Sequence, residues 1–127
     1  MGKIRVAIAD DSPAFAAAAA DYVARLPGYE VAGMARSAGQ AVALVRTTRP
    51  DVLLLDLGAA PARGLDVVRR VKALPAAPAV IAMTLFHSPE AAAAARHAGA
   101  DALVGKEAFV SGLTQILAVL FPARAAA

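Results

Sequence analysis

The sequence predicts an α/β fold in which five parallel strands alternate with helices, as a doubly wound (βα)5 domain of three layers. Segments of strand length alternate with segments of helical periodicity five times along the chain. Residues 52–55 are all apolar, as expected of a strand buried on both faces of a sheet. Glycine or proline lies in most of the connections between segments. Alternation of this kind is typical of a parallel sheet that helices cover on both sides.

Strands are expected where apolar residues alternate with others or run together for a few positions. The expected strands cover residues 3–9, 30–35, 52–55, 79–83 and 103–104. The first places Ile4, Val6 and Ile8 at the two-residue period of a strand. The fifth is the shortest, and it ends at Gly105.

Helices are expected between the strands, where apolar residues recur at helical spacing. The expected helices cover residues 13–26, 38–49, 64–74, 89–98 and 108–121. Ser12 and Ser88 each precede a proline, a common arrangement at a helix start, and Ser37 is expected to cap the second helix. Gly99 is expected to end the fourth helix. Residues 57–63 are expected to form a loop.

The composition excludes several classes of protein. At 127 residues the chain has the size of one domain, expected over residues 1–122 with a tail over 123–127. It has no cysteine, which excludes disulfides and thiolate metal sites. No apolar run reaches the roughly 20 residues of a membrane helix, and the first residues lead into a strand rather than a signal peptide. We therefore expect a soluble, cytoplasmic protein that has no membrane partner.

The net charge of +3 is modest, and the basic residues are spread along the chain. Their densest group is Arg69, Arg70 and Lys72. Nucleic-acid binders usually gather positive charge on one face and add a recognition element. We therefore expect no direct nucleic-acid binding by this chain.

Polar side chains follow four of the five expected strands. Asp10 and Asp11 follow the first strand, Asp56 the third, Thr84 the fourth and Lys106 comes just after the fifth. Because the carboxyl ends of parallel strands lie along one edge of the sheet, these side chains should converge there. In open α/β sheets this edge is where ligands bind.

The expected cluster has the chemistry of a phosphoryl-transfer site. Grouped carboxylates oppose one another's ionisation unless a cation neutralises them, and Mg²⁺ takes oxygen ligands of this kind. A carboxylate can attack phosphorus and form an acyl phosphate. The lysine, the threonine hydroxyl and a cation can balance the charge on the phosphoryl oxygens.

Sequence motifs at these positions resemble those of a known family. They are Ala9-Asp10-Asp11-Ser12, the segment 51–57 together with Gly64 eight residues after Asp56, Met83-Thr84, and the segment 99–109. Over nearly the whole chain, the sequence resembles a CheY-like receiver domain of bacterial two-component response regulators. The last segment is most similar to receivers that precede LuxR/NarL-type DNA-binding domains. The resemblance implies a flavodoxin/CheY-like three-layer sandwich.

The resemblance also implies a metal site. Asp11 and Asp56 would bind Mg²⁺ (or Mn²⁺) directly, together with the backbone carbonyl of Gly58. Asp10 would hold the ion through water. No organic cofactor is implied.

By the same resemblance, Asp56 is the phosphoacceptor, and Thr84 and Lys106 bind the phosphoryl oxygens. The donor would be a phosphohistidine on a sensor histidine kinase or a phosphotransfer protein. Movement of Thr84 toward the phosphoryl group would then alter the face formed by the fourth helix, fifth strand and fifth helix. The chain would assist its own phosphorylation without being a turnover enzyme.

The sequence departs from the family pattern at three places. Leu103 stands where many receivers have an aromatic residue, so we expect no aromatic switch. Glu107 follows the lysine where a proline is common. After the phosphoacceptor, Ala59-Ala60 replace the usual Met-Pro, and Pro61 comes one position late.

The expected last helix has no charged residue between 108 and 121. Val110, Val119 and Phe121 are expected outside its core-facing stripe. Exposed apolar surface of this extent often marks a protein contact, so a homodimer or another partner is expected on this face. Both histidines, His87 and His97, are expected to be exposed to solvent.

Three other functions remain open at this level. The chain could be the receiver part of a longer LuxR/NarL-type regulator. It could be a metal-dependent phosphohydrolase with Asp56 as nucleophile, although Gly58 replaces the second aspartate that haloacid-dehalogenase-type phosphatases use. It could also be a constitutive binding module, which the intact Asp56 and Lys106 argue against.

Overall fold

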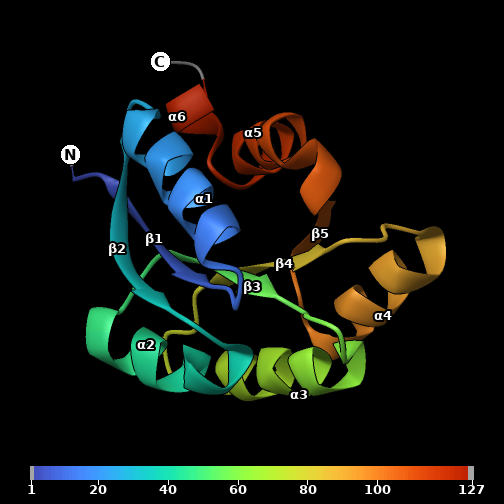
Figure 1. Cartoon of the computed structure of the whole chain (residues 1–127). Coiled ribbons are helices and arrows are strands. Elements are labelled where there is room, and N and C mark those ends of the chain that lie inside the picture. Colours follow the sequence, from blue (N-terminus) through green and yellow to red (C-terminus); the bar gives the residue numbers. More distant parts are fainter. Residues whose placement is uncertain (1, 126–127) are drawn as a thin grey trace.

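Five parallel strands form one sheet in the order β2-β1-β3-β4-β5 (Figure 1). The strands are β1 (Ile4–Ala9), β2 (Tyr29–Ala35), β3 (Val52–Asp56), β4 (Ala79–Thr84) and β5 (Ala102–Gly105). This computed structural model describes residues 2–125 of the chain. All four strand pairings are parallel, so the predicted fold class is confirmed.

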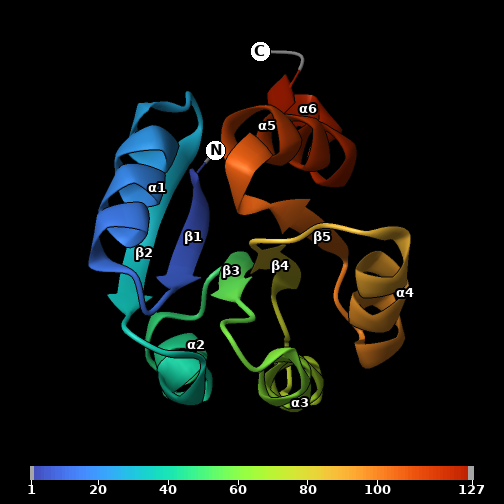
Figure 2. The ribbon, with the colours of Figure 1, turned by 45° about the vertical axis from the view of Figure 1, so that its right-hand side comes forward.

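Helices cover both faces of the sheet (Figure 2). They are α1 (Pro13–Arg25), α2 (Ala41–Thr48), α3 (Pro61–Lys72), α4 (Pro89–Ala98), α5 (Phe109–Leu120) and the short α6 (Pro122–Ala125). Helices α1 and α5 pack on one face, and α2, α3 and α4 pack on the other. The winding direction changes where β1 and β3 lie side by side, which opens the carboxyl ends of these two strands to a ligand.

The apolar run of β3 contributes to both halves of the core. Leu53 and Leu55 pack with the helices α2, α3 and α4, whereas Val52 and Leu54 pack with α1 and α5. All four side chains are fully buried. Successive side chains of a strand point to opposite faces, so β3 needs apolar residues at every position. The prediction that this strand is buried on both faces is confirmed.

Two helix starts differ from the prediction. Helix α3 begins at Pro61, three residues earlier than expected, because proline is well suited to the first turn of a helix. The loop before it is correspondingly short. The side chain of Ser37 makes no capping hydrogen bond; a 3₁₀ turn over Ala38–Gln40 precedes α2 instead. By contrast, Ser12 and Ser88 cap α1 and α4 as predicted.

Helix α5 carries apolar side chains on its exposed side as well as on the side that faces the core. Val110 is 56% exposed and Val119 is 80% exposed, as predicted. The prediction for Phe121 was wrong: its ring packs edge-on against Tyr29, with centroids 6.4 Å apart, because the chain turns toward the core after α5. Helix α6 contains Pro122, the last residue of the expected domain, and residues 123–125 of the expected tail; residues 126–127 lie outside the described part.

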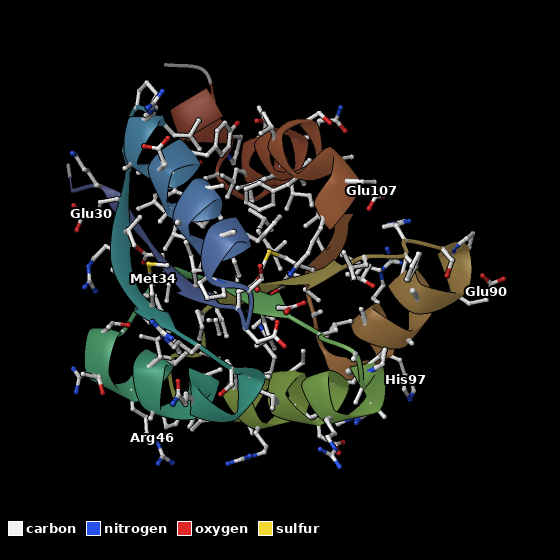
Figure 3. All side chains as sticks on the ribbon, in the orientation of Figure 1. Glu30, Met34, Arg46, Glu90, His97 and Glu107 are labelled. Carbon is white, nitrogen blue, oxygen red and sulfur yellow. The ribbon has the colours of Figure 1, made fainter. Side chains whose placement is uncertain are left out.

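Both histidines are exposed, as predicted. His97 points away from the domain on α4 (Figure 3). Among residues 2–125, no helix combines the length and the apolar character that are needed to cross a membrane.

Candidate functional site

Three carboxylates meet at the carboxyl ends of β1 and β3. Asp10 and Asp11 follow β1, Asp56 is the last residue of β3, and these strands are direct neighbours in the sheet. One oxygen from each acid lies within 4.8 Å of those from the other two. Asp10 and Asp56 are 2% and 7% exposed, while Asp11 is open to solvent. The geometry brings together the acids that the sequence predicted would converge.

Backbone amides hold two of these carboxylates in place. The N–H of Ser12 donates to Oδ1 of Asp10 (2.8 Å), and the N–H of Gly58 donates to Oδ1 of Asp56 (3.0 Å). Gly58 adopts the left-handed conformation, with φ 71°, and this conformation is accessible to glycine at little cost. The tight turn after β3 therefore leaves Oδ2 of Asp56 free for another partner.

Lys106 supplies that partner from the end of β5. Its Nζ lies 2.9 Å from Oδ2 of Asp10 and 3.4 Å from Oδ2 of Asp56. The Lys106 side chain is only 9% exposed. The buried Oδ2 of Asp10 has no hydrogen-bond partner among the described residues, so the ion pair with Lys106 is what compensates its charge. An uncompensated buried carboxylate would cost several kcal/mol.

The carboxyl group of Asp11 has a raised pKa, above its usual value of 3.8. The first cause is a hydrogen bond between Asp11 and Asp56, which requires a proton on Asp11. The charge of Asp56, loss of hydration and the charge of Asp10 act in the same direction, and Lys106 acts against them. One ammonium group therefore does not fully balance the acids, and the oxygen-rich cluster fits a hard divalent cation.

Thr84 lies at the same rim of the sheet, one strand further on. It pairs with Gly105 across β4 and β5, and its Oγ1 accepts a hydrogen bond from the N–H of Phe86 (3.3 Å). Thr84 lines a neighbouring apolar pocket with Gly58 rather than the acidic pocket itself. The hydroxyl is thus close in the fold to the acids but is engaged elsewhere.

The acidic pocket has a volume of about 590 Å³. Its lining includes the predicted Asp11, Asp56, Gly58 and Lys106, but also Phe15 and Leu85, which sequence reasoning missed. Phe15 is four residues after Asp11, on the first turn of the helix that follows β1. Its position in the sequence, close behind the acidic residues at the end of β1, could have indicated that Phe15 lies at the site.

Two of the positions that depart from the family pattern, Leu103 and Glu107, can be described in the structure. Leu103 is half-buried on the face of the sheet that α2, α3 and α4 cover. No peptide bond among the described residues is cis, including the one between Lys106 and Glu107.

The fold and the site together define a class: doubly wound α/β domains whose functional site is an acidic pocket at the carboxyl edge of the sheet. The chain belongs to the response regulator receiver domain family, whose model matches residues 6–118. It is therefore a domain of two-component signalling.

Curated relatives and solved structures agree with this assignment. A protein-glutamate methylesterase/protein-glutamine glutaminase from Caulobacter vibrioides is 32% identical over 93% of this chain, which spans 35% of that protein. A similarly named protein from Anaeromyxobacter dehalogenans is 43% identical over 55% of this chain, which spans 20% of that protein. A LuxR-family response regulator from Aurantimonas is 28% identical with a TM-score of 0.84, covering 97% of this chain and 88% of that one. The chain thus spans only about a third or less of these two curated relatives.

Proposed function

We propose that Asp56 accepts a phosphoryl group from a phosphohistidine on a sensor kinase or phosphotransfer protein. The observation that carries the proposal is the position of Asp56: its Oδ1 is fixed by the Gly58 amide, and its Oδ2 faces Lys106 at an open pocket. A nucleophilic oxygen, a cation and an entry for the donor thus occur in one place.

In the transfer, an Asp56 carboxylate oxygen attacks phosphorus while the bond from phosphorus to the imidazole nitrogen breaks. The imidazole leaves with its electron pair and is then protonated. Lys106 would balance the charge on the phosphoryl oxygens, and the 3.4 Å between its Nζ and Oδ2 of Asp56 supports this role. The Thr84 hydroxyl can contribute after it leaves the Phe86 amide, which is a change of hydrogen-bond partner at the end of β4.

Asp11 and Asp56 would hold a divalent cation, Mg²⁺ (or Mn²⁺), with the Gly58 carbonyl, and Asp10 would act through water. The cluster of three acids within 4.8 Å supports this assignment. When bound, the ion supplies positive charge next to the phosphoryl oxygens.

The direct test compares the wild-type protein with Asp56→Asn. After incubation with MgCl₂ and acetyl phosphate, the wild type should gain the mass of one phosphoryl group and lose it again on treatment with hydroxylamine. Asp56→Asn should gain none, and chelation of the metal should prevent labelling of the wild type. Equal labelling of the two proteins would contradict the assignment of Asp56.

Metal affinity should depend on pH through Asp11. Below the raised pKa of Asp11 the cation must displace a proton, so Mg²⁺ affinity should fall by up to about tenfold per pH unit. Without metal, the folded protein keeps this proton at pH values between 3.8, the usual pKa of the unfolded chain, and the raised pKa of Asp11. The free energy of unfolding should therefore fall as the pH rises through this range. Calorimetric titration with MgCl₂ at several pH values measures the first effect. An affinity that does not change with pH would contradict it.

The signal would leave through the face formed by α4, β5 and α5. Support comes from the hydrogen bond that links Thr84 to the loop before α4, and from the exposed Val119 on α5. A homodimer through this face is one form of output. Sedimentation velocity with beryllofluoride and Mg²⁺ should then show a dimer for the wild type and a monomer for Val119→Lys. A monomer for the wild type both with and without beryllofluoride would contradict the dimer.

The output arrangement has an alternative. The curated relatives contain sequence beyond the part that this chain matches, so the chain can also serve as the receiver part of a longer regulator, such as one of the LuxR/NarL type. In either arrangement we propose a cytoplasmic switch that turns over no external substrate. Release of phosphate from small phosphate esters would contradict that last statement.

A further inference from the structure

The aromatic ring of Phe15 lies against the ammonium group of Lys106. Nζ of Lys106 is over the ring, 4.4 Å from its centroid. A cation within about 6 Å of an aromatic face is attracted by the negative potential of that face. The attraction is stronger where water is excluded, and the Lys106 side chain is only 9% exposed.

The ring is itself held from two directions. The backbone N–H of Phe15 donates to the hydroxyl of Ser12 (3.3 Å), and this hydrogen bond fixes the first turn of α1. The Phe15 and Phe109 rings pack in a T-shaped arrangement, with centroids 5.1 Å apart and an interplanar angle of 77°. Phe109 is buried and opens α5, only three residues after Lys106. The segment that carries the lysine thus also braces the ring that faces it.

The ammonium group is therefore bounded on three sides, by Asp10, Asp56 and Phe15. The two carboxylates attract it but leave it a choice of positions between them. The face of the ring attracts the ammonium group as a third partner, and Phe15 lines the pocket through which a phosphoryl group would reach Asp56.

We propose that Phe15 is a positioning residue for phosphoryl transfer, whose ring face holds the Lys106 ammonium beside the phosphoacceptor. The contact between ring and ammonium stands by itself, whereas its consequence for transfer rests on the proposed function. Leucine at position 15 would keep an apolar wall and lose the attraction for the cation. Tyrosine or tryptophan would retain it.

The contact is tested first, by NMR. Protons above an aromatic ring are shifted upfield, so the ε-methylene protons of Lys106 should move downfield, toward the random-coil value, in Phe15→Leu. Phe121→Leu, which removes a ring that packs on Tyr29 instead, is the matched control and should leave them unchanged. Unshifted Lys106 protons in the wild type would overturn the proposal whether or not Asp56 is phosphorylated.

The consequence is tested by fluorination of the ring, which weakens its negative face with little change in shape. Mono-, di- and trifluorophenylalanine at position 15 should slow labelling by acetyl phosphate in even logarithmic steps, to about fivefold overall. The same series at position 121 should have no effect, and Phe15→Trp should label nearly as fast as the wild type. A flat series at position 15 would overturn the positioning role. Failure of the wild type itself to label would instead contradict the proposed function, and the NMR result would then decide the contact alone.

Discussion

Replacement of Lys106 by methionine is expected to lower the free energy of unfolding of the metal-free domain by about 2–4 kcal/mol, because two buried carboxylates lose the cation between them. Methionine keeps most of the side-chain volume, so lost packing should account for only a small part of this decrease. Most of the decrease should come from the missing charge. MgCl₂ should restore part of the stability by supplying another positive charge. Urea denaturation with and without MgCl₂ measures both effects.

The same variant should be phosphorylated at least about a hundredfold more slowly, because a fixed charge on the phosphoryl oxygens is absent. Lys3→Met is the matched control: Lys3 is exposed, and its removal should change stability by less than about 0.5 kcal/mol and leave labelling unchanged. If Lys106→Met and Lys3→Met unfold at the same urea concentration, the buried ion pair does not stabilise the fold.

Replacement of Gly64 by alanine is expected to destabilise the domain by about 1–3 kcal/mol. A Cβ atom at this position would lie 2.8 Å from the Cα of Leu57 and 3.0 Å from its carbonyl oxygen, which are backbone atoms that cannot rotate away. The loop after β3 must therefore shift, and Gly58, whose amide holds Asp56, moves with it. Mg²⁺ affinity and the rate of phosphorylation should fall together with stability.

Gly39→Ala provides the comparison. Its Cβ would meet no atom closer than 3.8 Å, and alanine favours the helical conformation of this turn. It should be neutral or slightly stabilising, with unchanged labelling. A denaturation midpoint of Gly64→Ala equal to that of the wild type would show that the loop after β3 has room to move.

The ends of the strands could be predicted because burial sets a local rule. A strand in the middle of a parallel sheet needs apolar residues on both faces, so the first polar residue after the apolar run marks the exposed edge. Asp10 and Asp56 were found in this way, and parallel topology then required that they meet. The start of α3 was predicted less well: a glycine within the segment concealed a helix that begins at Pro61.

Other features depended on contacts between segments that are distant in the sequence. The sequence shows that Phe121 is apolar, but only the turn after α5 brings it to Tyr29. The Thr84 hydroxyl was placed at the correct rim, yet its hydrogen bond with the Phe86 amide depends on the path of the loop after β4.

The sequence by itself determined the parallel sheet, the edge at which the site lies, and which side chains carry its charge. These follow from periodicity and from the termination of apolar runs, which are properties of single segments. Tertiary structure alone decided that Lys106 pairs with both buried acids and rests against Phe15. Those contacts join residues that are 50 to 96 positions apart in the sequence. Their geometry is fixed by side-chain packing that no local pattern encodes.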